Sequence, residues 1–387
     1  MGAVVAAALA LLPGVASAAC DTANQYTFSY AARAAATLAY GTTYTYTATS
    51  GSGATRTFTV NVSQNGLSST QVNTTQMPMI GTLVTGATSS ANALNFGGTF
   101  SSRTASMTGT TRVIVMTVTF SQPVRDFALT AFDIDYTLNQ FRDWVQVTGS
   151  DGTNTYTPAL STPWGNGNGA TQPRTATSSS LTSGATTTPV TLTSSQVAGT
   201  GASGNNSDTG TLYASFAQPV TSITFKYGNY PLTGTETTSG QQAIGIGGFS
   251  FCPMPALALT KTSAPASGTL GAYNIPGNDV IYTLSLANSG GSPVDAGTVV
   301  LTDTLPAGVT FRNNAFDGTT SLPVKVVSAG GTSLGAADIT YSKVGDATFT
   351  YTPASGYDPQ VDAIRIAPTG ALAANSTLQV QFAAQVR

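Results

Sequence analysis

The sequence predicts a mainly β protein with two antiparallel sandwiches, an N-terminal one of jelly-roll type and a C-terminal immunoglobulin-like one. Three observations lead to this prediction. The chain has 387 residues, which is enough for two or three ordinary domains. It is rich in Gly, Ser and Thr but has only four lysines and one glutamate, a composition typical of short strands and turns. Apolar and polar residues alternate along many short runs, which is the period of a half-buried strand.

The composition also argues against several classes of function. Only 8% of the residues are charged and the formal net charge is −2, so the chain lacks the basic footprint of a nucleic-acid-binding protein. It has no histidine, which excludes Ser-His-Asp and Cys-His catalysis and imidazole zinc sites. With Glu236 as the single glutamate, a glycosidase would need a pair of aspartates instead. We therefore expect a protein that is not an enzyme.

The N-terminus resembles an export signal. Residues 3–12 are continuously apolar, Pro13 and Gly14 end the run, and Ala16-Ser17-Ala18 has the small-x-small form of a cleavage site. No Lys or Arg precedes the run, which departs from the usual pattern. We predict a signal peptide over residues 1–18 and an exported protein of the bacterial cell surface, outer envelope or medium. No later stretch reaches the roughly 18 apolar residues of a membrane span, so none is predicted.

The chain has two cysteines, Cys20 and Cys252. In an exported protein two cysteines most simply form one disulfide, which here would join the two ends of the first half. The alternative is a lipoprotein with its lipid on Cys20. Ser17 stands three residues before Cys20, where a lipobox usually has Leu, so we predict the disulfide.

A Pro-Met-Pro connector at residues 253–255 follows Cys252 and separates a first half, 19–252, from a second, 256–387. In the first half, Ala31–Leu38 is the one expected short helix. Two similar segments, Phe120–Val124 and Phe216–Val220, are interpreted as the turns of two hairpins. Short β-rich runs are expected at Gln25–Tyr30, Thr43–Thr49, Thr55–Val62, Arg112–Phe120, Asp126–Tyr136, Trp144–Thr148, Val190–Thr193, Leu212–Phe216, Thr221–Tyr227 and Ala243–Cys252.

The second half shows the clearest alternation. Apolar and polar residues alternate over 280–287 and again over 377–386, which predicts two half-buried strands of an antiparallel sandwich.

This half also contains an ordered series of motifs: Leu257-Ala-Leu-Thr-Lys261-Thr, then Pro276-Gly-Asn-Asp-Val-Ile-Tyr-Thr-Leu, then Asn288-Ser-Gly, then Val300-Leu-Thr-Asp303-Thr-Leu-Pro-Ala-Gly-Val-Thr. The series resembles the bacterial conserved-repeat domain of unknown function, an immunoglobulin-like sandwich of surface proteins. The resemblance covers 256–387 and implies a spacer, stalk or assembly module. Residues 19–252 resemble only loosely the jelly-roll modules of secreted bacterial proteins.

Three carboxylates lie close together in the first half. In a strand, Asp133 and Asp135 would share one face, and Asp143 follows shortly after them. Like charges side by side are costly unless they are solvated, hydrogen-bonded or bridged by a cation, and oxygen ligands of this kind suit Ca²⁺. The alternatives are a solvated strand edge with Arg125 or Arg142 as counter-charge, and an aspartate pair for glycoside hydrolysis.

Two further features are candidate sites. Several aromatic residues could stack on sugar rings: Trp144, Trp164, Tyr26, Tyr30, Tyr40, Tyr44 and Tyr46. Trp164 is the best candidate because it lies in a Gly/Asn-rich loop, although most aromatic residues of such a chain pack in the core. Lys261 and Asp303 both fall on apolar strand faces by parity, which predicts a buried ion pair. The alternatives for Lys261 are exposure at a strand end and a Lys–Asn cross-link to Asn288 or Asn375.

From the sequence we therefore expect a non-enzymatic exported envelope or surface protein that serves in adhesion or as a structural spacer. Its partner would be another envelope or surface component or a glycan. The alternative is a carbohydrate-binding protein that uses the loop of Trp164. Calcium is the one cofactor that the residue pattern suggests.

Overall fold

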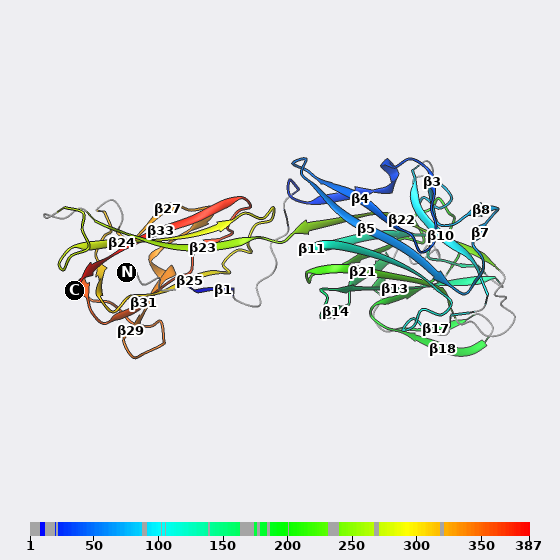
Figure 1. Cartoon of the computed structure of the whole chain (residues 1–387). Coiled ribbons are helices and arrows are strands. Elements are labelled where there is room, and N and C mark those ends of the chain that lie inside the picture. The colour runs from blue at the N-terminus through cyan, green and yellow to red at the C-terminus, as the bar shows by residue number, and fades with distance from the viewer. Residues whose placement is uncertain are drawn as a thin grey trace. The chain divides into compact units, whose positions relative to one another are not determined.

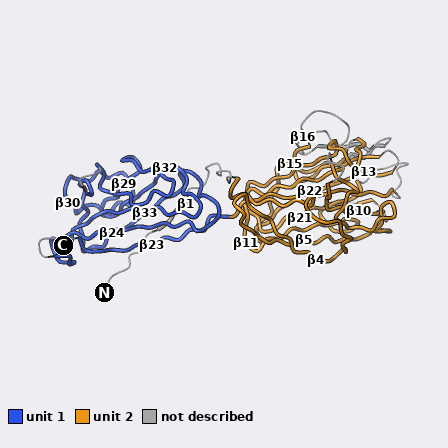
Figure 2. Tube along the Cα trace, turned by 90° about the horizontal axis from the view of Figure 1, so that it is seen from above, with its two compact units in different colours: residues 1–20, 254–387 blue, residues 21–253 orange. Residues whose placement is uncertain are grey.

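The computed structural model describes residues 8–11, 20, 22–86, 91–101, 103–104, 106–137, 140–162, 174–175, 179–183, 186–199, 201–230, 240–266, 271–317 and 321–387 (Figure 1). The chain divides into two compact units, which Figure 2 colours separately. Unit 2 is Asp21–Pro253, and unit 1 is Met1–Cys20 with Met254–Arg387. The boundary falls inside the Pro-Met-Pro connector predicted from the sequence.

The regular secondary structure of the described residues is almost entirely β-strand, which confirms the predicted mainly β fold class. Among them, no helix is long and apolar enough to cross a membrane. The strands of unit 2 are β2 (Tyr26–Ser29), β3 (Ala36–Thr37), β4 (Thr43–Ser50), β5 (Thr55–Asn65), β6 (Leu67–Ser69), β7 (Gln71–Val72), β8 (Thr75–Gln76), β9 (Met79–Gly81), β10 (Ala93–Phe100), β11 (Val113–Phe132), β12 (Tyr136–Thr137), β13 (Phe141–Ser150), β14 (Thr155–Tyr156), β15 (Ala159–Thr162), β16 (Arg174–Thr175), β17 (Ser179–Ser183), β18 (Thr186–Leu192), β19 (Gln196–Ala198), β20 (Leu212–Ser215), β21 (Val220–Asn229) and β22 (Gln241–Pro253).

Strand β11 determines the topology of unit 2. Its first part, Val113–Phe120, pairs with β5 and β21, and its last part, Ala128–Phe132, pairs with β20 and β22. The strand thus passes from one set of neighbours to another, and register shifts mark the passage between Thr119 and Ala128. Hydrogen bonds consequently close most strands of unit 2 into one barrel, where a sandwich with two separate sheets was expected.

The two similar segments meet at this passage. The sequence interpretation of Phe120–Val124 and Phe216–Val220 as hairpin turns is wrong for both. β11 runs through the first segment without reversing, and β20 and β21, on either side of the second, pair antiparallel with successive parts of β11. Instead the segments lie opposite each other, with Val124 in register with Val220. Phe127 contacts both Phe120 and Phe216, at ring-centroid distances of 5.8 and 6.3 Å. The repeated motif therefore marks a bend shared by two antiparallel chain segments.

The expected helix over Ala31–Leu38 is also wrong. A single 3-10 turn, Tyr30–Ala32, is followed by the short strand β3. The Ser29 hydroxyl accepts a hydrogen bond from the Ala31 N–H and starts the turn, and Tyr30 is fully buried. Burial of this aromatic ring outweighs the weak helix preference of the alanines that follow.

Unit 1 is a two-sheet antiparallel sandwich. One sheet has the order β1-β25-β31-β29, and the other has β23-β24-β33-β26-β30, with β27 also paired to β33. Their inner faces share one core, which includes Leu284, Leu301, Phe311, Ile364 and Phe382. The strands are β1 (Ala8–Leu11), β23 (Leu257–Pro265), β24 (Asp279–Asn288), β25 (Val299–Thr304), β26 (Val309–Asn313), β27 (Val324–Ser328), β28 (Thr332–Ser333), β29 (Ile339–Lys343), β30 (Gly356–Asp358), β31 (Val361–Ile366), β32 (Thr369–Gly370) and β33 (Ser376–Val386).

Both alternating runs of the second half form central strands. β24 pairs with β33 along ten consecutive residue positions, from Asp279↔Gln385 to Asn288↔Ser376. Burial alternates strictly along β24, with the apolar residues facing the core. The period-two pattern in the sequence therefore predicted these strands and their buried faces correctly.

Of the predicted signal peptide, the structure describes only Ala8–Leu11. These residues form β1, which pairs antiparallel with β25, from Ala8↔Thr302 to Leu11↔Val299. Removal of residues 1–18 stays a prediction. Beyond this segment, Cys20 and Cys252 are disulfide-bonded, as predicted, and so join the two ends of the first half of the chain.

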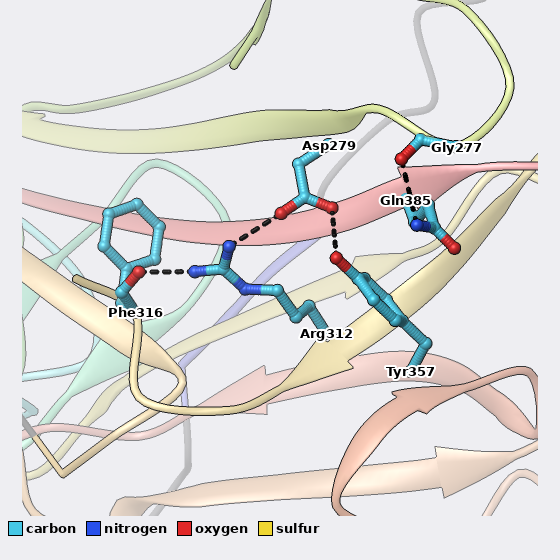
Figure 3. Close-up of polar contacts among 6 residues, drawn as sticks. All are labelled: Gly277, Asp279, Arg312, Phe316, Tyr357 and Gln385. Carbon is cyan, nitrogen blue, oxygen red and sulfur yellow. Dashed lines mark hydrogen bonds and ion pairs between the residues drawn. The ribbon is translucent and has the colours of Figure 1, made fainter. Parts of the chain in front are cut away.

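A polar cluster ties the strands of unit 1 together at one end of the sandwich (Figure 3). The Arg312 guanidinium on β26 lies 2.6 Å from the Asp279 carboxylate on β24 and also donates to the Phe316 carbonyl. The Tyr357 hydroxyl on β30 donates to the other Asp279 oxygen at 2.9 Å. Both charged side chains are mostly buried, which strengthens their attraction.

We expect Arg312→Ala to destabilise unit 1 by about 1–3 kcal/mol, because it leaves the Asp279 carboxylate mostly buried without its cation. Lys325→Ala is the matched control, since Lys325 pairs with Asp317 at 2.8 Å but is 41% exposed. Its removal should cost less than about 1 kcal/mol. Hydrogen exchange of the β24 and β33 amides under denaturant measures both changes. Equal losses of stability in Arg312→Ala and Lys325→Ala would contradict a stabilising role for the Arg312–Asp279 pair.

Candidate functional site

The three aspartates selected from the sequence do come together, but not on a strand face. β11 ends at Phe132, and Asp133 has a left-handed backbone with φ of 66°. The predicted continuation of the strand to Tyr136, with Asp133 and Asp135 on one face, is therefore wrong. The alternative of a solvated strand edge is wrong too, because both side chains are buried. The Ile134 N–H donates to the Gly210 carbonyl at 2.9 Å, so the backbone leaves the sheet to bond with a loop. Aspartate tolerates the left-handed conformation better than most residues.

All three carboxyl groups are buried, and those of Asp135 and Asp143 share a hydrogen-bond network. Asp143, on β13, accepts a bond of 2.7 Å from the Tyr227 hydroxyl and one of 3.1 Å from the Asp135 N–H. Asp135 in turn accepts from the Ser203 N–H at 3.0 Å. Among the described residues, Asp133 Oδ1 has no hydrogen-bond partner. The cluster is thus only partly satisfied by the protein.

The loop 199–211 lies directly against this cluster. The Tyr136 N–H donates to the Gly201 carbonyl at 3.1 Å, and the Gly199 N–H donates to the Asp143 carbonyl at 2.9 Å. A Cβ atom at Gly199 would lie 1.8 Å from the Asp135 carbonyl oxygen. Only glycine permits this approach, so the loop is fitted to the backbone beneath it.

Burial raises the pKa of each of these carboxyl groups. It raises the pKa of Asp133 to about 8, with a further contribution from the charge of Asp135. It raises the pKa of Asp135 to about 6 and that of Asp143 well above its usual range. The cluster therefore holds at least one proton at neutral pH.

The two arginines considered as counter-charges make other contacts. Arg125 lies 3.7 Å from Asp126, the residue after it. Arg142 donates to the Gly199 carbonyl at 2.8 Å, and its guanidinium lies 4.0 Å from the centre of the Tyr136 ring. Arg142 thus fastens the covering loop at its first residue.

The calcium hypothesis gains no support from the geometry. Within the described part of the chain, no group of three or more acidic, thiol or imidazole side chains is arranged to hold a metal ion. Both oxygens of Asp143 already accept hydrogen bonds from the protein. A calcium site on Asp133, Asp135 and Asp143 stays a prediction.

A second feature of unit 2 is a groove of about 540 Å³ over β20, β11, β22 and β2. Cross-strand register places Ser215, Ala128 and Ser250 side by side on three of these strands. The adjacent row consists of Tyr213, Thr130, Gly248 and Ser29. These side chains point away from the core, and most of them are small, so the sheet face is hollowed.

The groove combines aromatic and hydroxyl groups without charge. Tyr213 is 45% exposed, and Phe132 lines the groove from the end of β11. None of the described residues that line it is charged. The sequence offered no signal for this groove, because its walls come from four strands far apart in the chain.

The aromatic residues proposed from the sequence fare differently. Trp164, the predicted sugar platform, lies outside the described residues. Trp144 is buried and meets the Tyr230 ring edge-on, with centroids 5.5 Å apart. Tyr26 and Tyr30 are likewise part of the core. For these three residues the packing interpretation is correct.

The predicted ion pair of unit 1 is present. Lys261 Nζ lies 2.6 Å from Asp303 Oδ1, and both side chains are largely removed from water. The alternative in which Lys261 is exposed at a strand end is wrong. The side-chain amide of Asn288, one proposed cross-link partner, donates instead to the Ser292 and Ala373 carbonyls.

No family model and no curated protein matches the chain. The resemblance of residues 256–387 to the conserved-repeat domain therefore rests on the motifs alone and stays a prediction.

We expect unit 2 to lose stability as the pH rises from about 4 to about 8. The folded state holds protons on Asp133 and Asp135 more tightly than the unfolded chain, whose aspartates titrate near 3.8, so raising the pH through this window favours unfolding. Asp133→Asn should reduce the loss between pH 5.5 and 8.5 by at least about 1 kcal/mol. Both tryptophans belong to unit 2, so urea unfolding followed by tryptophan fluorescence measures it.

Asp208→Asn is the control, because Asp208 lies in the same loop but is only half-buried. It should keep the wild-type pH dependence. If the unfolding free energy of the wild type varied with pH as little as that of Asp133→Asn, the conclusion that Asp133 holds a proton in the folded state would be contradicted. A melting temperature at pH 8.5 that rises with Ca²⁺, in wild type but not in Asp135→Asn, would instead establish the calcium site.

Proposed function

We propose that the chain is a non-enzymatic, exported protein of the bacterial envelope or cell surface. In this proposal unit 2 binds another surface component, and unit 1 acts as the spacer or docking module. The disulfide supports it, because such bonds persist in oxidising compartments outside the cytoplasm. The resemblance of unit 1 to surface-protein repeats, predicted from its motifs, agrees with a spacing role.

The state of the acidic residues supports a non-catalytic role. A glycosidase needs two carboxyl groups that reach the glycosidic bond from opposite sides. Asp133, Asp135 and Asp143 are instead buried against the loop 199–211, and Asp135 and Asp143 accept hydrogen bonds from the backbone and Tyr227. Asp135 holds the loop through the Ser203 N–H, and carboxyl groups buried in this way are not presented to a substrate.

The observation that carries the binding role is the uncharged groove of unit 2. An exposed tyrosine beside a hollow sheet face with hydroxyl groups suits a neutral, hydroxyl-rich ligand, since rings pack on the apolar faces of sugars while hydroxyls exchange hydrogen bonds. This feature favours the second candidate function, carbohydrate binding. The proposal differs from the sequence hypothesis in its residues, with Tyr213 in place of Trp164.

Fractionation of the producing cells tests the first proposal. We expect the protein in the outer envelope, at the cell surface or in the medium, without residues 1–18. Recovery of the full-length chain from the cytoplasm would refute it.

Binding to an array of neutral oligosaccharides and envelope glycans tests the second proposal. We expect Tyr213→Ala to weaken binding at least about tenfold, which corresponds to the loss of roughly 1.4 kcal/mol of contact. Tyr273→Ala is the control, because Tyr273 is an exposed tyrosine of unit 1. An array without any bound glycan, or equal binding by both variants, would leave adhesion to a protein component as the remaining function.

A further inference from the structure

The Lys261–Asp303 pair connects the two sheets of unit 1. Lys261 lies on β23, in the sheet that contains β24 and β33, and Asp303 lies on β25, in the opposite sheet. Lys261 Nζ and Asp303 Oδ1 are 2.6 Å apart, and the side chains are 10% and 0% exposed. An amine and a carboxyl group are thus held in contact inside a sandwich, with water largely excluded.

The surroundings of the pair disfavour the charge of Asp303. The Tyr282 ring packs against Lys261 in a cation–π contact, with its centre 4.6 Å from Nζ, and holds the amine in place. Asp303 Oδ2 is buried and, among the described residues, has no hydrogen-bond partner. Burial raises the pKa of Asp303, and Lys261 only partly offsets this effect. Such an environment stabilises the neutral carboxylic acid of Asp303 relative to the carboxylate, and the carboxylic acid is the form that an amine can attack.

We propose that Lys261 and Asp303 condense to an amide, which forms an intramolecular isopeptide bond between β23 and β25. A proton passes from the ammonium of Lys261 to the carboxylate of Asp303. The Nζ lone pair then attacks Cγ of Asp303, and a carboxyl oxygen leaves as water with a second proton from the nitrogen. One C–N bond forms, one C–O bond breaks, and no oxidant or other reactant is required.

Proximity supplies the driving force for a reaction that does not occur between free side chains. Groups held in contact react as if at a very high effective concentration, and a desolvated lysine is a better nucleophile than a hydrated ammonium ion. The chain enters this part of unit 1 through β23, which pairs with β24. A covalent bond from β23 to the opposite sheet would oppose separation of this strand under load, as a spacer requires.

The intact mass of the exported protein tests the proposal. We expect the main species to lack the mass of one water molecule, in addition to the two hydrogens lost in the disulfide. Lys261→Arg and Asp303→Ala should each show no such deficit. The Lys325–Asp317 pair is an internal control, because it has a similar separation of 2.8 Å but is 41% and 24% exposed.

Tryptic mapping after reduction locates the bond. An unlinked chain yields the peptides 227–261 and 262–312, since Lys261 is the one cleavage site between Lys226 and Arg312. The linked chain should yield 227–312 as a single peptide lighter by one water, while cleavage after Lys325 stays normal. A main species of full mass that is cut after Lys261 would overturn the proposal and leave a non-covalent ion pair.

Discussion

The passage of β11 between two sets of neighbouring strands is the constraint on which unit 2 depends. One strand supplies hydrogen bonds to β5 and β21 in its first part and to β20 and β22 in its last. Its buried residues therefore serve two parts of the same core, and the phenylalanines at the bend fill the space where it turns. The same geometry places the end of β11 beside both the groove and the buried carboxylates.

The two units treat buried charge in different ways. Unit 1 pairs two aspartates of its sheets with cations, Asp303 with Lys261 and Asp279 with Arg312. Unit 2 brings three aspartates together, where burial and mutual repulsion favour protonation. The first arrangement ties strands together by attraction. The arrangement in unit 2 uses a carboxyl oxygen as a hydrogen-bond acceptor for a loop. In return, the buried carboxyl groups keep protons at a pH at which solvent-exposed aspartates would have lost them.

Features that follow from the alternation of apolar and polar residues could be predicted from the sequence. Features that depend on pairing between distant strands could not. Alternation was sufficient for β24 and β33, and parity alone placed Lys261 and Asp303 on buried faces. It failed at Asp133, because one left-handed residue breaks the period of two on which a shared face depends. The groove had no local signal in the sequence, since small residues on separate strands form a hollow surface only when the strand register places them side by side.

The surface features of unit 2 and the polar contacts of unit 1 suit different roles. In unit 2, the loop 199–211 and the sheet-face groove both depend on where β11 ends, so its core packing determines the presentation of its surface. In unit 1, charged side chains that are largely buried make contacts between strands and sheets: Lys261 with Asp303, and Arg312 with Asp279, which also binds Tyr357. Contacts of that kind resist the sliding and separation of strands and present nothing to a ligand. This contrast is why we propose a binding role for unit 2 and mechanical support for unit 1.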